Sequence, residues 1–210
     1  MRWLFALALV GIVACQHDVE TPFPAGLEPF EPDPVPPLTG TPTETLQTQT
    51  NDGGFIHVYG RGDVLAPPGT VWAAAKNPEV LAAVCSTTKH TSIVGDEPQY
   101  EYSFVIHYEE DNILTVIWDD QWRFGTVEGT PDAPTLAMIK HQKIDGSSFI
   151  SRSEGTIEVL ATDDDNVTEL DFVEHLDSVG ASTDDVLRGV THTYQSIVAA
   201  THGLPSPACP

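Results

Sequence analysis

Basic residues are scarce in this sequence. The 210 residues include nine lysines and arginines against 31 aspartates and glutamates, which gives a formal net charge of −22 at pH 7. A surface this acidic repels the phosphate backbone of nucleic acids, so we expect no nucleic-acid partner. The excess of carboxylates is typical of a well-hydrated surface, with calcium or a cationic partner as the alternative explanation.

The sequence also lacks an apolar run long enough for a membrane span. The N-terminal apolar stretch, residues 3–14, is too short to cross a bilayer comfortably, and after Arg2 it is typical of a secretory signal peptide. It ends in Ile12-Val13-Ala14-Cys15, which resembles the lipobox of bacterial lipoproteins. The resemblance implies that residues 1–14 are removed and that acyl chains on Cys15 anchor the protein to the cell envelope. Gln16 after the cysteine favours the outer membrane, whereas an ordinary secretory signal with a coincidental cysteine is the alternative.

Motifs of common enzymes and metal sites are missing as well. The sequence has no nucleophile elbow, no cysteine–histidine pair in a recognisable context and no glycine-rich phosphate-binding loop. None of the eight histidines lies three or four residues from another, as metal ligands on a helix would. The run Asp163-Asp164-Asp165-Asn166 lacks the glycine and the final glutamate of an EF-hand loop. We therefore assign no catalytic residue, and we expect no metal and no cofactor.

Proline is concentrated ahead of the folded part. Residues 16–53 hold eight of the 17 prolines, with threonine, glutamate and glycine between them. Such a segment favours extended polyproline conformations and buries little apolar surface. We expect a signal peptide at 1–14, a tether at 15–53, one folded domain at 54–204 and a C-terminal tail at 205–210.

The folded part reads as one strand, two short helices, six strands and one long helix. Alternating apolar residues mark the strands, as in Tyr100–Tyr108, and the acidic run 119–121 indicates a bulge or bend within a long strand. The last helix has Ser182 and Asp185 in the spacing of a capping box. Its apolar residues recur at helical spacing from Val186 to Val198.

The opening of this part resembles a known family. Ala66-Pro67-Pro68, Val71-Trp72 and Asn77-Pro78-Glu79-Val80-Leu81 are similar to the first motifs of START-like, Bet v 1-like domains, the polyketide cyclase/SRPBCC superfamily. The resemblance implies an α+β helix-grip fold. In that fold a seven-stranded antiparallel sheet curves around a long C-terminal helix, and two short helices lie between strands 1 and 2.

The same resemblance implies a cavity between sheet and helix that holds a hydrophobic molecule or lipid. The residues expected to line it are Tyr102, Phe104, Ile106, Trp118, Trp122, Val190, Tyr194 and Ile197. The alternative is that these side chains fill the space as a solid core.

Three functions are compatible with this sequence. The first is a monomeric, envelope-anchored carrier of an apolar or amphipathic small molecule. The second is a cyclase-type enzyme, for which Tyr102 or His107 could transfer protons. The third is an envelope interaction protein with a filled core. Outside the cytoplasm two thiols tend to oxidise, and the V of short helices in this fold implies that Cys85 and Cys209 could form a disulfide. A buried free Cys85 is the alternative.

Overall fold

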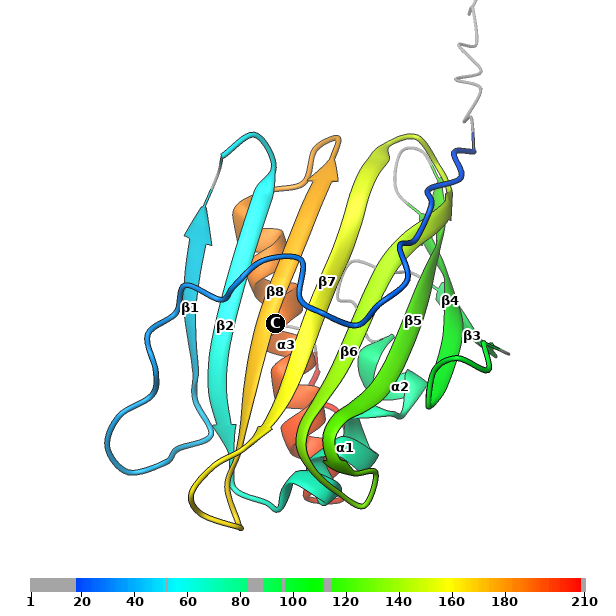
Figure 1. Ribbon diagram of the computed structural model, residues 1–210. Coiled ribbons are helices and arrows are strands. Elements are labelled where there is room, and N and C mark those ends of the chain that lie inside the picture. The colour runs from blue at the N-terminus through cyan, green and yellow to red at the C-terminus, as the bar shows by residue number, and fades with distance from the viewer. Residues whose placement is uncertain (1–17, 52, 83–88, 96, 112–114, 209–210) are drawn as a thin grey trace, which may run out of the picture.

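The computed structural model describes residues 18–51, 53–82, 89–95, 97–111 and 115–208 (Figure 1). These residues form, in order, β1 (Leu46–Asn51), β2 (Ile56–Val64), α1 (Pro68–Ala75), α2 (Pro78–Leu81), β3 (Lys89–Val94), β4 (Tyr102–Asp111), β5 (Thr115–Thr130), β6 (Ala133–Gly146), β7 (Ile150–Ala161), β8 (Thr168–Ser178) and α3 (Thr183–Thr201). From β2 onward this is the order of elements that the sequence predicts.

The strands form one antiparallel sheet in the order β1-β2-β8-β7-β6-β5-β4-β3. The described residues thus contain eight strands, and the expected number of seven was wrong. The additional strand is Leu46–Asn51, which pairs along β2 although its composition placed it in the tether. All its side chains after Leu46 are exposed, so it lacks the apolar alternation from which a strand is recognised.

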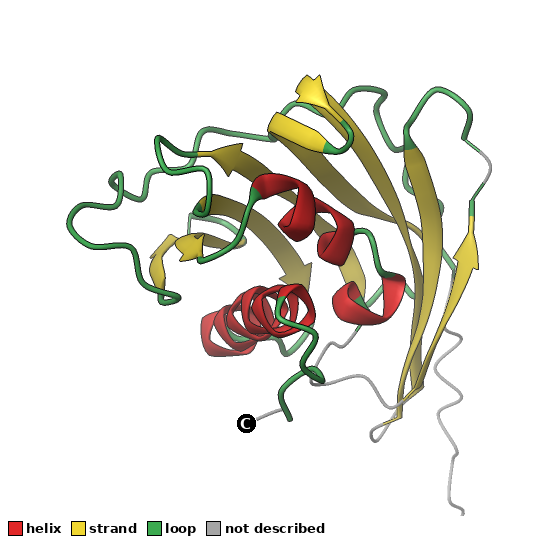
Figure 2. Cartoon of the chain, turned by 90° about the horizontal axis from the view of Figure 1, so that it is seen from below, coloured by secondary structure: helices red, strands yellow, loops and turns green. Residues whose placement is uncertain are grey.

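All three helices lie on the concave face of the sheet (Figure 2). α1 begins with Pro68. Proline lacks a backbone N–H, but in the first helical turn an N–H has no acceptor within the helix, so no hydrogen bond is lost. α2 begins where the Asn77 side chain accepts a hydrogen bond from the Glu79 N–H at 3.1 Å. The pair of short helices predicted around Asn77-Pro78 is therefore confirmed.

The long helix α3 is fixed to the sheet by one tyrosine. Ser182 and Asp185 form the predicted capping box at its start. The Tyr194 hydroxyl donates to the Asp63 carbonyl oxygen at 2.5 Å. A Cβ on Gly62 would lie only 2.7 Å from the Tyr194 ring, so glycine at this position allows the ring to reach β2.

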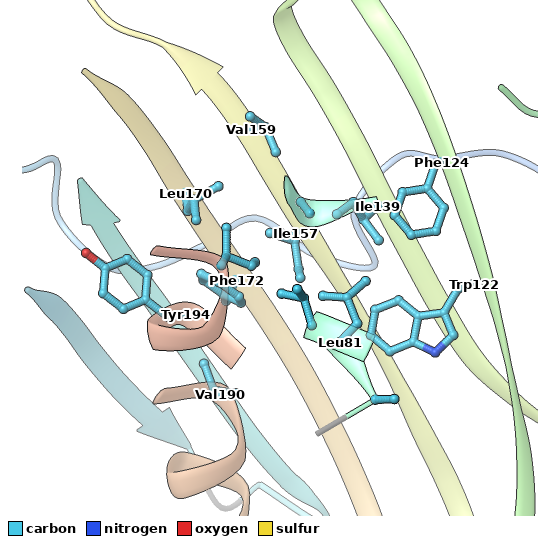
Figure 3. Close-up of a cluster of buried hydrophobic side chains, with 14 of the residues drawn as sticks. Leu81, Trp122, Phe124, Ile139, Ile157, Val159, Leu170, Phe172, Val190 and Tyr194 are labelled. Carbon is cyan, nitrogen blue, oxygen red and sulfur yellow. The ribbon is translucent and has the colours of Figure 1, made fainter. Parts of the chain in front are cut away.

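Side chains from the concave face and from all three helices form one hydrophobic cluster. Figure 3 shows part of it, with Trp122 and Phe124 on β5, Leu170 and Phe172 on β8, and Tyr194 on α3. This cluster is the core of the domain.

Residues 18–45, which we name the strap, cross the opposite, outer face of the sheet (Figure 1). Val35 in the strap is 4% exposed and packs with Tyr59 and Val173 of the sheet. The described part of the segment expected as a tether thus buries apolar surface on the domain.

Carbonyl oxygens of the strap accept hydrogen bonds from long side chains of the sheet. Arg123 donates to Pro24 at 3.1 Å, Lys140 to Glu28 at 2.9 Å, and Gln142 to Pro22 at 3.0 Å. A proline-rich segment lacks many N–H donors but keeps every carbonyl acceptor. Long polar side chains on the outer face therefore help to hold the extended strap on the sheet.

Some expectations fall outside this description. The signal peptide, the proposed lipid attachment at Cys15 and both cysteines of the expected disulfide, Cys85 and Cys209, lie outside the described residues. Among the described residues, no helix combines the length and the apolar character needed to cross a membrane.

Candidate functional site

The residues predicted to line a cavity lie on the concave face or on α3. Phe104, Ile106, Trp118, Trp122, Val190, Tyr194 and Ile197 are buried members of the core cluster, and Tyr102 is partly buried against it. The structure therefore gathers all eight into one apolar body.

Within that body they form two groups. The β4–β5 group is aromatic: Phe104 stacks on Trp122 with ring centroids 6.1 Å apart, and Tyr108 stacks on Trp118 at 4.9 Å. The helical group packs mainly on β2, β8, α1 and α2. Tyr194, for example, lies edge-on to Phe172 of β8 at 6.3 Å. Helix α1 contacts both groups, since it packs on α3 and its Trp72 ring meets Phe124 of β5 at 5.9 Å.

Two hollows open elsewhere on the described surface. One of about 440 Å³ is lined by Gly54, Phe55, Ile56, Ala181, Ser182 and Thr183, between the start of β2 and the start of α3. The other, of about 130 Å³, is lined by Thr21, Gln142, Lys143, Ser151, Arg152, Ser153 and Glu154. None of the eight predicted lining residues belongs to either hollow.

The concave face also carries a polar cluster that the sequence analysis missed. It consists of Asp120 on β5, His141 on β6 and Glu174 on β8. His141 Nε2 and Glu174 Oε2 are 2.9 Å apart, and the His141 ring stacks on Trp122 with centroids 4.1 Å apart and planes 13° apart. We call these three residues the inner polar cluster.

Gly155 on β7 explains how His141 and Glu174 meet. It is the cross-strand partner of both residues, so their side chains have to bridge the strand between them. A Cβ at this position would lie 2.4 Å from His141 Nε2 and 2.3 Å from Glu174 Oε2. Glycine is therefore required wherever this pair is to form.

Asp120 reaches the concave face because β5 stays regular along β4. Trp118, Asp120 and Trp122 lie opposite Tyr108, Ile106 and Phe104 without a register shift. The β5–β6 register shifts between Asp119 and Asp120, which pair with Asp145 and Lys143, so the extra residue is on β6 and not at the position where a bulge in β5 was expected. Asp120, within the acidic run of the sequence, supplies a buried carboxyl group.

The charges of this cluster depend on one another. Burial raises the pKa of Asp120 to about 7, and the Glu174 carboxylate adds to the rise, while His141 opposes it. Burial alone would lower the pKa of His141, but the Glu174 carboxylate, with Asp120, raises it overall. Burial, with Asp120 next, also raises the pKa of Tyr108 well above its usual value. The pKa of Asp120 therefore lies near neutral pH, and the Glu174 carboxylate favours the charged form of the His141 imidazole.

Three buried polar atoms in this patch have no hydrogen-bond partner within the described residues. They are Asp120 Oδ1, Trp122 Nε1 and His141 Nδ1. An acceptor and an indole donor beside a titratable imidazole suit the polar end of an amphipathic molecule, or proton transfer to one. By contrast, His107, the expected acid–base candidate, is on the outer face, where its Nδ1 is 2.5 Å from Asp119 Oδ1.

Sequence signals for the inner polar cluster were present but weak. Asp120, His141 and Glu174 interrupt the apolar alternation of three strands at inward positions, and Gly155 interrupts a fourth. Only the strand order and register place His141, Gly155 and Glu174 in one row across the sheet, with Asp120 two residues from Trp122, the β5 partner of His141. Each interruption alone is typical of an irregular strand.

No protein-family model matches the sequence, and no curated protein matches it. Among solved structures, the lipid transfer and protein localization domain of human StarD13 has a TM-score of 0.50 and 12% identity, over 79% of this chain and 87% of that chain. An aromatase/cyclase from Streptomyces sp. R1128 has a TM-score of 0.46 and 15% identity, over 70% of this chain and 91% of its own. Human STARD10 has a TM-score of 0.47 and 10% identity, over 79% and 72% respectively.

At such identities a likeness concerns the fold alone. The described chain has the antiparallel sheet, the paired short helices and the C-terminal helix of this architecture, with one strand more than expected. The START-like, helix-grip fold predicted from the sequence is therefore confirmed, and the StarD13 lipid transfer domain shares it.

Proposed function

We propose that this domain binds an apolar or amphipathic small molecule on its concave face. The apolar part of the ligand would lie against the β4–β5 aromatic residues, and its polar end against the inner polar cluster. The observation that carries the proposal is the set of three buried, unpartnered polar atoms on Asp120, Trp122 and His141, within an aromatic surface.

The energetic reason is the cost of unmade hydrogen bonds. A buried donor or acceptor without a partner costs about 1–3 kcal/mol. A ligand that donates to Asp120 Oδ1 and accepts from Trp122 Nε1 would recover part of that cost. Because the surrounding side chains pack closely, binding has to displace some contacts between them. The fold that the chain shares with a lipid transfer domain supports a lipid-like ligand.

The test begins by identifying any compound that is purified together with the protein. Full-length protein purified from its native host is extracted with organic solvent, and the extract is analysed by mass spectrometry. We expect one apolar or amphipathic compound in near-stoichiometric amount. In His141→Gln we expect about tenfold less, which corresponds to the loss of about 1.4 kcal/mol of binding. His107→Gln, on the outer face, is the matched control and should retain the compound.

The opposite result is equally clear. The proposal fails if no compound is extracted from the wild-type protein and if lipids added to it leave the fluorescence of Trp118 and Trp122 unchanged. It also fails if the two histidine variants lose the compound equally.

A second candidate function is cyclase-type catalysis, favoured by one observation. A buried carboxyl with a pKa raised to about 7 by burial, beside an imidazole, is suited to general acid–base work. If a reactive polyketone is turned over, Asp120→Asn should abolish turnover while keeping binding. Equal turnover in that variant would exclude Asp120 as the base.

The location is part of the same proposal. Ile12-Val13-Ala14-Cys15 supports cleavage before Cys15 and acylation of its thiol, which would place the domain on the membrane surface. We expect Cys15→Ser to move the protein from the membrane fraction to the soluble fraction. An unmodified Cys15 in the mass of the wild-type N-terminal peptide would contradict the anchor.

A further inference from the structure

A second cluster of titratable side chains lies on the outer face, away from the inner polar cluster. Glu31 of the strap meets His57 on β2 and His175 on β8. Glu31 Oε1 is 2.9 Å from His57 Nδ1 and 2.8 Å from His175 Nε2. One potential ligand atom from each residue lies within 4.8 Å of the other two.

We propose that Glu31, His57 and His175 bind a divalent transition-metal ion, with zinc as the fitting ion. Two imidazoles and one carboxylate form a ligand set that zinc accepts, and such a set leaves one position open. The sequence analysis expected no metal because the histidines are far apart along the chain. His57 and His175 are nevertheless directly paired across β2 and β8.

Zinc coordination requires the Glu31 carboxylate to move. Zinc ligands at about 2.0–2.1 Å in a tetrahedron lie about 3.3 Å from one another. The Glu31 carboxylate therefore has to withdraw by about half an ångström from its present hydrogen-bond distances. Its side chain is 34% exposed and belongs to the strap, so it has room to move.

The two imidazole rings are already held in place. His57 stacks on Phe55 with centroids 4.2 Å apart, and the His57 and His175 rings are 4.5 Å apart. His175 Nδ1 is 3.2 Å from Glu154 Oε1, and Arg152 donates to that same oxygen at 2.6 Å. A carboxylate on the second ring nitrogen fixes the orientation of a metal-binding histidine.

Tyr59 completes the surroundings. Its hydroxyl donates to Glu31 Oε1 at 2.5 Å, so it can orient the carboxylate or stand beside the open position. Because Glu31 is the only strap residue among the three ligands, the ion would cross-link the strap to the two strands beneath it (Figure 1). The inferred role is to fasten the strap to the domain.

The test uses the full-length chain, stripped with a chelator and titrated with ZnCl₂ in a calorimeter. We expect one equivalent to bind, with affinity reduced more than about 100-fold in Glu31→Gln and in His57→Gln, and about 10–100-fold in Glu154→Gln, which touches no metal. His107→Gln is the control, since His107 also pairs with a carboxylate but is in no group of three potential ligands among the described residues. This control should bind zinc as the wild type does.

Two further readouts separate this site from adventitious binding. Cobalt in place of zinc should give visible bands without the near-ultraviolet band of cysteine thiolate ligation. Zinc should also slow amide hydrogen exchange in peptides from the strap of the wild type, but not of Glu31→Gln. Glu31 lies on the strap, so its substitution leaves the core folded. The proposal is overturned if zinc fails to bind, or if Glu31→Gln binds it as tightly as His107→Gln does.

Discussion

At the scale of single residues, Gly155 is the position on which the inner polar cluster depends. Gly155→Ala places a Cβ 2.3 Å from Glu174 Oε2 and 2.8 Å from the Val173 carbonyl oxygen, so both a charged pair and the backbone have to shift. We expect a loss of about 1–3 kcal/mol in the free energy of unfolding, measured by urea denaturation.

Gly189 in α3 provides the matched control. No atom lies within 4 Å of a Cβ added there, and the position is helical. Gly189→Ala should therefore stabilise the protein by about 0.5–1 kcal/mol. If both alanine variants change the free energy of unfolding in the same direction and by the same amount, the close approach at Gly155 does not affect stability.

Asp120 predicts a pH dependence of stability. Burial, with Glu174 second, raises its pKa to about 7, above that of an unfolded aspartate, so between these two values the folded state binds more protons than the unfolded state. Stability should then fall as pH rises through this window, by about 2–3 kcal/mol between pH 5 and pH 8 from this group. The raised pKa of His141 acts in the same direction, because the stability it contributes is lost as pH rises through its folded-state value.

Asp120→Asn removes the titrating carboxyl. The difference in unfolding free energy between pH 5 and pH 8 should shrink in this variant, whatever its absolute stability. It should not vanish, because burial and then Glu169 raise the pKa of Asp171 to about 7 as well. A pH dependence unchanged from wild type would mean that Asp120 titrates normally in the folded state.

The sequence predicted residues of the apolar core better than residues of either polar cluster. Phe104, Trp122 and Tyr194 follow the periodicity of their own strand or helix, so burial can be inferred locally. His141 and Glu174 meet only because β7 and β8 are neighbours and a glycine separates them. That contact is a property of strand order and register, which periodicity does not contain.

At the scale of elements, the start of α3 is a feature that neighbouring residues in the sequence predict. The capping box was read correctly: the Ser182 hydroxyl accepts from the Asp185 N–H at 3.3 Å, and Asp185 Oδ2 accepts from the Ser182 N–H at 2.9 Å. Ser182→Ala removes the hydroxyl that accepts from the Asp185 N–H and should cost about 1 kcal/mol, measured by thermal or urea unfolding.

Ser182→Thr keeps a hydroxyl at the cap and is the control for this prediction. It should retain most of the wild-type stability. The hydrogen bonds from Ser182 lower the pKa of Asp185. The contribution of the box is therefore complete above the unfolded pKa of aspartate and is lost as pH falls through the lowered folded value. If Ser182→Ala costs nothing at neutral pH, the cap does not stabilise the helix.

The contacts of the strap could not be predicted from the sequence, for a physical reason. They are made by carbonyl oxygens of the strap and by the long side chains of Arg123, Lys140 and Gln142, which lie about a hundred residues away in the sequence. Composition describes what a segment can bury by itself. It does not describe which acceptors another strand will use.

At the scale of the whole molecule, the contacts of the strap would limit the distance between the domain and a membrane if Cys15 is acylated as proposed. The Val19 N–H donates to the Gly146 carbonyl oxygen at 2.8 Å, and Asp18 forms an isolated antiparallel β-bridge with Ser147. Asp18 is three residues further along the chain than Cys15, a reach of at most about 10 Å. An acylated Cys15 would therefore hold the β6–β7 end of the sheet close to the lipid surface instead of on a long tether.

This geometry predicts different depths for the two ends of the sheet. Ser148 lies in the β6–β7 turn and Asp165 in the β7–β8 turn, and the 12 residues of β7 separate them, about 40 Å at the rise of a strand. A fluorophore carried by a non-natural amino acid at position 148 should be quenched strongly by quencher lipids in vesicles. The same fluorophore at position 165 should remain bright. Cys15→Ser protein is the control and should show no quenching at either position.

The outcome also bears on ligand entry. The hollow lined by Phe55 and Ser182 lies at the same end, since β8 finishes beside the start of β7 and β2 starts beside the last residues of β8. Anchoring through Cys15 would then turn this opening toward the bilayer, which is where the proposed amphipathic ligand would enter. Equal quenching at the two positions would mean that the strap detaches on the membrane. The domain would then have no fixed orientation there, and the opening would have no advantage over the rest of the surface.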